Sequence, residues 1–213
     1  VAFVSGYIDT TSGPALGLFV ALPDGSVVEW MSVELATIQI IHNSPGTDVD
    51  LYFNDQLVLD SFTYTQATQT AFQQGGVDIK IDIAPSGSTS SADAIYTETV
   101  NLDNFKNYIV FAEGVVGDMD APFRLTIVDN KRLSAENPDQ AEVLIHHGSP
   151  DAPSVDVGER NESILLTDLA FGETSTEYLG FEVRNYLLSL YPTGTTDEFK
   201  TFQANFTNSE GLL

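Results

Sequence analysis

The sequence predicts an all-β protein built from β-sandwich domains. Short segments of alternating apolar and polar residues follow one another along the chain, and they are rich in Val, Ile, Tyr and Phe. Gly, Pro, Asn or Asp bounds these segments, and a Pro-x-Gly turn recurs at Pro23–Gly25, Pro85–Gly87 and Pro192–Gly194. No stretch has the pattern of a helix longer than one or two turns. Many short strands with such spacing are typical of sandwiches with Greek-key connections.

One sequence pattern occurs twice. A His-x-Ser-Pro motif followed by Val-Asp begins at His42 and again at His147. Each copy later contains one of the Pro-x-Gly turns, and the prolines of these turns are 192 − 85 = 107 residues apart. A period close to one domain length indicates a duplicated domain rather than the units of a solenoid.

Part of the pattern occurs a third time, at the N-terminus. The segment "AFVSGYID…PALGLFVALPDGS" resembles the segment "VFAEGVVG…APFRLTIVDNKRL" that follows Ile109. The matched pairs are Phe3 with Phe111, Gly6 with Gly114, Leu18 with Leu125, and Val20 with Ile127. The second repeat has no such tail before Leu213. We therefore expect tail strands at 1–34, a complete first domain at 35–133, a linker at 134–140, and a second domain at 141–213 that lacks its last strands.

The tail is thus surplus to the first domain and missing from the second. We expect Leu16, Leu18 and Val20 to point one way and, with Phe3, to complete a domain of the second type. The residues expected to accept them are Leu188, Leu190, Phe202 and Phe206. Three interpretations stay open: the tail closes onto the second domain of the same molecule, it inserts into the next molecule, or the chain is a piece of a longer tandem array.

Composition excludes several partners. The net charge is −23, from 31 acidic residues against 8 basic ones, so nucleic acid and anionic membrane surfaces are poor partners. The absence of Cys excludes disulfides, thiolate catalysis and thiolate metal sites. No run approaches about 20 apolar residues, so the sequence predicts no membrane span.

The repeat resembles a family of bacterial extracellular domains known as domain of unknown function 4397. The second repeat carries its opening motif, an aliphatic residue followed by "x-H-x-S-P-D-A-P-x-V-D-V", and then Leu169-Ala170-Phe171-Gly172. The first repeat keeps Ile40, His42, Ser44, Pro45, Val49 and Asp50, but departs from the motif at Gly46 and Thr47. The resemblance implies immunoglobulin-like sandwiches on secreted or surface-anchored proteins, and it implies no known activity.

Each repeat contains the residue types of a hydrolytic triad. These are His42, Ser44 and Asp50 in the first copy, and His147, Ser149 and Asp156 in the second. No nucleophile elbow or oxyanion hole accompanies them, so we interpret both sets as polar clusters that fix a turn. Neighbouring His146 and His147 would point to opposite faces of a strand, which disfavours a shared metal ion.

The sequence leaves two further kinds of binding site open. The acidic pairs Asp48/Asp50, Asp118/Asp120 and Asp151/Asp156 could contribute to a calcium site, although no EF-hand or nonapeptide loop is present. Otherwise we expect no cofactor. Trp30, Tyr64, Tyr178 and Tyr191 could stack on a sugar, although most aromatic residues are expected in the core.

The sequence therefore favours a non-catalytic, extracellular or cell-surface structural protein. In the leading hypothesis it is a filament subunit whose partners are copies of itself, joined head to tail by β-strand exchange. The alternative is a monomeric adhesin, or a module that binds a glycan or another surface ligand, closed by its own tail.

Overall fold

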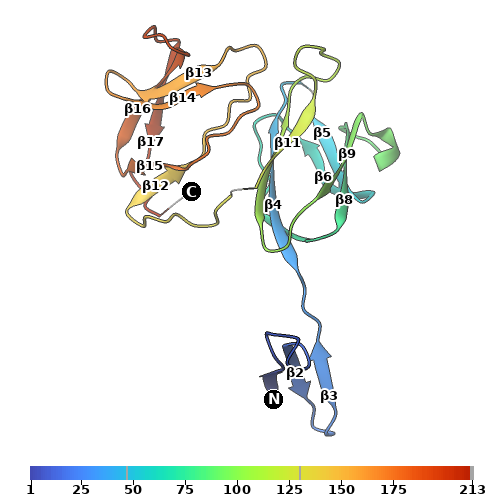
Figure 1. The fold of residues 1–213 in the computed structure, drawn as a ribbon. Coiled ribbons are helices and arrows are strands. Elements are labelled where there is room, and N and C mark those ends of the chain that lie inside the picture. The colour runs from blue at the N-terminus through green and yellow to red at the C-terminus, as the bar shows by residue number, and fades with distance from the viewer. Residues whose placement is uncertain (47, 130, 212–213) are drawn as a thin grey trace.

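The computed structural model describes residues 1–46, 48–129 and 131–211, and it is all-β, as the sequence predicted (Figure 1). Its strands fall into three groups along the chain. A small N-terminal sheet is followed by two larger units, each with two sheets.

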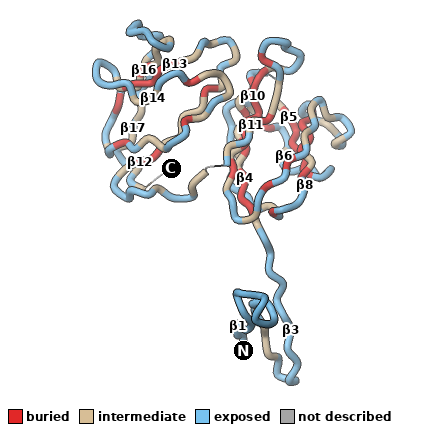
Figure 2. The backbone as a smooth tube through the Cα atoms, in the orientation of Figure 1, coloured by how far each residue is buried: buried red, intermediate tan, exposed pale blue. Residues whose placement is uncertain are grey.

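The N-terminal sheet contains β1 (Ala2–Ser5), β2 (Gly17–Ala21) and β3 (Val27–Trp30), in the order β1-β2-β3. The predicted Pro-Asp-Gly turn joins β2 to β3, and Leu22 and Ser26 close it with a backbone hydrogen bond of 2.9 Å. This sheet stands apart from both larger units and reaches them through an extended segment before β4 (Figure 1). Its outer strands β1 and β3 are exposed to solvent, while most of β2 is half-buried between them (Figure 2).

The first larger unit is a two-sheet sandwich. One sheet has the order β11-β10-β4-β7 and the other β6-β5-β8-β9. The strands are β4 (Leu35–Asn43), β5 (Val49–Phe53), β6 (Gln56–Phe62), β7 (Ala71–Gln74), β8 (Asp78–Pro85), β9 (Tyr96–Asn101), β10 (Asn107–Glu113) and β11 (Arg124–Val128), with a single 3₁₀ turn η1 (Ser91–Asp93). Inward residues of both sheets, among them Ile38, Leu51, Ile81 and Val110, form one buried core.

The second larger unit has fewer strands and a smaller core. A two-stranded sheet, β12-β15, faces a four-stranded sheet of order β14-β13-β16-β17. The strands are β12 (Gln140–Val143), β13 (Val155–Glu159), β14 (Ile164–Leu169), β15 (Leu179–Glu182), β16 (Asn185–Pro192) and β17 (Lys200–Asn205). Among the described residues, the buried members of its core cluster are Val155, Val157 and Leu169.

Candidate assembly site

The N-terminal hairpin has the pairing register of the β10–β11 hairpin. In the tail, Phe3 pairs with Phe19 and Val4 with Leu18. The matching residues of the first sandwich pair in the same way: Phe111 with Thr126, and Ala112 with Leu125. The remaining tail pairs, Ala2 with Val20 and Ser5 with Gly17, match Val110 with Ile127 and Glu113 with Arg124.

The likeness continues into the loop that closes each hairpin. An isolated parallel bridge joins Tyr7 to Ala15 in the tail, and another joins Val115 to Pro122 in the first sandwich. Gly6 and Gly114 precede these bridges with φ of +106° and +79°. At either glycine a Cβ atom would collide with a carbonyl oxygen across the loop, so only glycine fits. The tail therefore folds as a copy of β10–β11 without a sandwich around it.

The pairing register assigns the apolar residues of the tail hairpin to its two faces. Val4 and Leu18 are cross-strand partners, so they share one face, and their matches in the first sandwich are core residues. Phe3 lies on the other face, where its ring stacks on Phe19 at 5.6 Å. Val4 therefore shares the face of Leu18, and Phe3 lies on the opposite face of the same strand.

The core-completing face is exposed in this chain. Val4 is 66% exposed while Ala112 is 2% exposed, and Leu18 is 37% exposed while Leu125 is 8% exposed. Leu16 and Trp30 extend the same apolar strip and line a shallow cavity of about 380 Å³ with Val4 and Leu18. A contiguous exposed apolar strip of this kind is typical of an interaction surface.

The second unit has an open edge where the first has β10. In the first sandwich β10 lies parallel to β4, with Phe111 opposite Ile41. In the second unit β12 pairs with β15, and no other strand of the described residues pairs with it. The turn at Gly211 resembles the turn that precedes β10. Gly211 N–H donates to the Gln140 carbonyl, as Phe105 N–H donates to the carbonyl of Leu35.

Core positions beside this edge are only partly covered. Ile40 and Ile81 of the first sandwich are 2% and 0% exposed, whereas the matching Ile145 and Leu188 are half-buried. Among the predicted acceptor residues, Leu190 is also half-buried and Phe202 is 47% exposed. Phe206 is already engaged, since its ring stacks on Phe181 at 4.9 Å. The second unit therefore leaves several of its apolar positions less covered than the matching positions of the first sandwich.

In both triad-like sets the aspartate lies in a different hydrogen-bond network from the histidine. Asp50 accepts hydrogen bonds from Ser61 N–H (2.9 Å) and from the backbone and hydroxyl of Ser88. Asp156 accepts from Asp168 N–H (2.8 Å) and Gly194 N–H (3.0 Å). Each aspartate therefore ties a β-bulge to a Pro-x-Gly turn, and the bulge residues Ser61 and Asp168 share a φ of +55°.

The histidines and serines fix the turn that follows them. Ser44 N–H approaches His42 Nδ1 at 3.4 Å, and its hydroxyl donates to the Gly114 carbonyl. Ser149 N–H approaches His147 Nδ1 at 3.3 Å, while His147 Nε2 bonds the Pro153 carbonyl at 3.1 Å. Both serines are thus held in turns that their histidines close.

Replacing Asp50 by Asn should destabilise the first sandwich. Burial opposes ionisation of Asp50, but hydrogen bonds from Ser61 and Ser88 outweigh it and hold the pKa of this carboxyl below its usual value. Asn has only one acceptor oxygen, so its NH2 group would face either Ser61 N–H or Ser88 N–H, which now donate to the two carboxylate oxygens. We therefore expect a loss of about 2 kcal/mol in the free energy of unfolding at pH 7. Urea denaturation would measure it, with Asp48→Asn as the control. Equal stability of the two variants would contradict this account.

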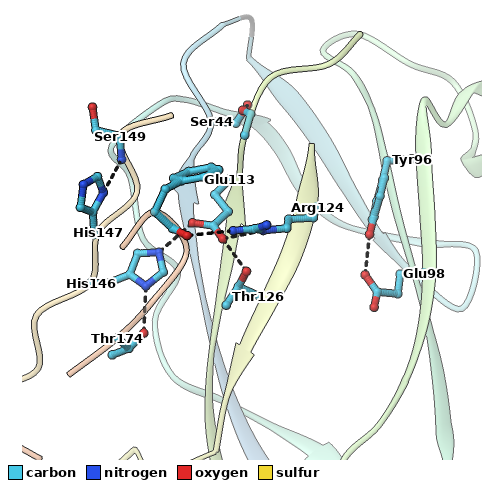
Figure 3. A network of polar contacts seen from close by, with 12 residues as sticks. Ser44, Tyr96, Glu98, Glu113, Arg124, Thr126, His146, His147, Ser149 and Thr174 are labelled. Atoms are coloured by element: carbon cyan, nitrogen blue, oxygen red, sulfur yellow. Dashed lines mark hydrogen bonds and ion pairs between the residues drawn. The ribbon is translucent and has the colours of Figure 1, made fainter. Parts of the chain in front are cut away.

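A buried polar network joins the two larger units (Figure 3). Glu113 is fully buried and accepts hydrogen bonds from Arg124 (3.0 Å), Thr126 and His146 (2.8 Å). The other ring nitrogen of His146 bonds Thr174 at 2.8 Å. Around the network the His146 ring stacks on Phe111 at 3.7 Å, and the Arg124 guanidinium lies 4.8 Å from the Phe171 ring. A buried carboxylate needs such partners, so the network fixes the two units to each other.

Sequence reasoning did not find this junction. The available signal is that Glu113 and Arg124 are the charged residues of two otherwise uncharged strands. The sequence suggests His146 only as a possible metal ligand, because its hydrogen bond to Glu113 depends on how the two units pack.

The junction should weaken in acid. Burial opposes ionisation of Glu113, but hydrogen bonds from His146, Thr126 and Arg124 outweigh it and lower its pKa below the ordinary 4.5. A lowered folded pKa gives stability that is present above the unfolded value and lost as the pH falls through the folded value. Thermal unfolding followed by circular dichroism should therefore show wild type above Glu113→Gln at pH 7, with a difference that shrinks below about pH 4.5. A constant difference down to pH 3 would contradict the assignment.

A cavity of about 790 Å³ opens beside the junction. It is lined by Asn43, Pro45, Tyr64, Val115, Asp118, Asp120, Ala121, His146, Gly148, Ser149, Pro150 and Asp151. The Asp118 carboxylate is used within its own loop, where it accepts from the backbone of Asp120 and Ala121. Among the described residues no group of three or more His, Asp or Glu could hold a metal ion.

The four aromatic residues considered for sugar stacking do not gather. Trp30 belongs to the N-terminal sheet, Tyr64 lines the cavity at the junction, and Tyr191 lies in β16. Tyr178 contacts the segment just before the linker, since Arg132 lies 3.9 Å over its ring and donates its backbone N–H to the hydroxyl.

Comparison with known proteins identifies one relationship. The family model described as a domain of unknown function, DUF4397, matches residues 36–158. The match begins at β4 and ends in β13, and so covers the whole first sandwich and the start of the second unit. No curated protein matches the chain. Among the residues that the structure describes, no helix is long and apolar enough to cross a membrane.

Proposed function

This chain belongs to the DUF4397 family, which carries no assigned activity, and we propose that it is a non-catalytic structural subunit of an extracellular or cell-surface filament. In this proposal the β1–β2 hairpin of one molecule completes the second unit of the next, so that subunits join head to tail. The contact is heterologous and grows into a filament unless it closes into a ring.

The observation that supports this proposal is the shared register of the two hairpins. Because β1–β2 pairs residue for residue as β10–β11 does, it can occupy in the second unit the place that β10–β11 occupies in the first. By the same correspondence β1 would lie parallel to the segment that follows β12, with Phe3 opposite His146 as Phe111 lies opposite Ile41. Strand addition of this kind supplies main-chain hydrogen bonds and fills alternate side-chain pockets.

Two features support an extracellular location. The family resemblance implies secreted or surface-anchored proteins, and a chain without Cys that carries a net charge of −23 fits a well-solvated external surface.

A disulfide trap tests the exchange directly. Val1 would lie opposite Leu144, because Ile109 lies opposite Gln39 in the first sandwich. The chain has no Cys, so a variant with Val1→Cys and Leu144→Cys carries only these two thiols. Strand neighbours in register have Cα atoms close enough for a disulfide. Val1→Cys with Leu187→Cys, an exposed position on β16, serves as the control.

The pattern on a non-reducing gel decides between the interpretations. A ladder of covalent oligomers from the Val1/Leu144 variant, and not from the control, supports exchange between molecules. A covalently closed monomer of higher mobility would overturn the filament proposal and favour a protein closed by its own tail. Failure of the two thiols to join in either way would overturn strand completion altogether.

A further inference from the structure

The junction between the two larger units contains a contact between equivalent positions. Asn43 and Gly148 are the same position of the repeated His-x-Ser-Pro motif, and a Cβ on Gly148 would collide with the Asn43 amide. When equivalent positions of two repeats contact each other, the repeats are related by a local two-fold axis. Each contact from the first repeat to the second then has an equivalent contact from the second repeat to the first, which we call its image.

The other contacts of the junction are present once, without their images. Phe111 and Glu113 contact His146, and Arg124 contacts Phe171, so the first sandwich supplies its β10–β11 face to the second unit. To form the images of these contacts, the second unit would need a hairpin equivalent to β10–β11. In the proposed assembly the docked hairpin supplies this face.

The image of each contact can be named from the repeat. Phe111 corresponds to Phe3, and His146 corresponds to Ile41 through the shared motif, so the image of the Phe111–His146 stack is Phe3 against Ile41. Arg124 corresponds to Gly17 and Phe171 to Tyr64. The edge contact of His42 with Tyr64 at 6.4 Å matches that of His147 with Phe171 at 6.5 Å, which supports this last correspondence.

The target surface is open to a partner. Ile41 points away from the core formed by Ile38 and Ile40, and it lies next to Phe111 in register. Tyr64 is 44% exposed and lines the 790 Å³ cavity at the junction. On the hairpin, the outward face is the stacked pair Phe3 and Phe19, which fits an apolar contact rather than the charged one made by Glu113 and Arg124.

We propose that Ile41 and Tyr64 form a second docking surface for the hairpin of a neighbouring copy, which packs Phe3 onto them while its other face completes the second unit. The inference rests on the proposed function and extends it. The hairpin then binds a composite site made by both larger units of one molecule, so its docking requires the junction and also locks it.

A double-mutant cycle tests this surface. The variants are Phe3→Ser, Ile41→Ser and their combination, with Tyr64→Ser as a second, exposed position. The control is Phe72→Ser on β7, because Phe72 is 71% exposed and lies in the same sheet at its far edge. Thermal unfolding verifies that each variant folds, and sedimentation equilibrium gives the association constant between subunits.

We expect Phe3→Ser, Ile41→Ser and Tyr64→Ser each to weaken association by about tenfold, as loss of an apolar anchor at an interface does. The Phe3/Ile41 double variant should be scarcely weaker than either single variant, because the two side chains act through one contact. Phe72→Ser should associate like wild type. Association unchanged by Ile41→Ser and Tyr64→Ser, or fully additive effects of Phe3 and Ile41, would overturn this inference alone. Wild-type protein that never associates would overturn the filament proposal as well.

Discussion

Leu18→Asp is expected to abolish association between subunits while leaving the first sandwich folded. Leu18 is the counterpart of the core residue Leu125 and would be buried against the second unit of the next molecule. An unpaired carboxylate in such a place costs about 3 kcal/mol or more, which is over a hundredfold in the association constant. Sedimentation velocity across a range of concentrations measures the effect.

The control for this variant is Val27→Asp. Val27 belongs to the same sheet, is 55% exposed and pairs with Ala21, so it lies on the face opposite Leu18. Both variants add one negative charge to the N-terminal sheet, and only Leu18→Asp places it on the completing face. Equal association of the two variants would show that the strip of Val4 and Leu18 is not the contact.

Glycine-to-valine changes at Gly114 and Gly6 should have opposite effects on folding and assembly. At both positions φ is positive and a Cβ would collide with a carbonyl of the facing loop, Pro122 at Gly114 and Ala15 at Gly6. Gly114→Val should lower the free energy of unfolding of the first sandwich by about 3 kcal/mol or more, since its loop is anchored to the buried core. Gly6→Val should leave that free energy unchanged and remove association, because it deforms only the hairpin.

Urea denaturation and sedimentation of the two variants, side by side, measure both quantities. Each variant is the other's control, since the substitution and the local geometry are the same. A Gly6→Val protein that still assembles, or a Gly114→Val protein as stable as wild type, would show that the two hairpins are not equivalent.

Much of the architecture could be predicted because the repeat carries it. Period-two alternation and the Pro-x-Gly turns predicted the all-β fold, and the match of Phe3 and Gly6 to Phe111 and Gly114 anticipated a hairpin that the structure places in the same register. Which residues of that hairpin share the face of Leu18 could not be predicted. Phe3 and Val4 are both apolar, and a shift of one residue exchanges the two faces of a strand, so only the observed pairing shows which one faces a core.

The junction could not be predicted for a different reason. The partners Glu113 and His146 belong to different repeats, and their contact depends on how two folded units orient. No spacing along the chain encodes that orientation. The sequence predicted one polar cluster in each turn. Its division into a histidine–serine pair and a separate aspartate network is visible only in the bonds of Asp50 to Ser61 and Ser88.

The N-terminal hairpin is already paired strand to strand before it meets a partner, with the backbone of Val1 and Ala21 joined at its open end. A donor in this state gives up little chain freedom on docking, whereas a disordered donor strand would have to be ordered at that moment. Encounter should therefore resemble the collision of two rigid bodies, fast and without a slow ordering step. Such a subunit would need no dedicated chaperone to hold its donor segment extended, and the rate of growth would be set by how often two molecules meet in the correct orientation.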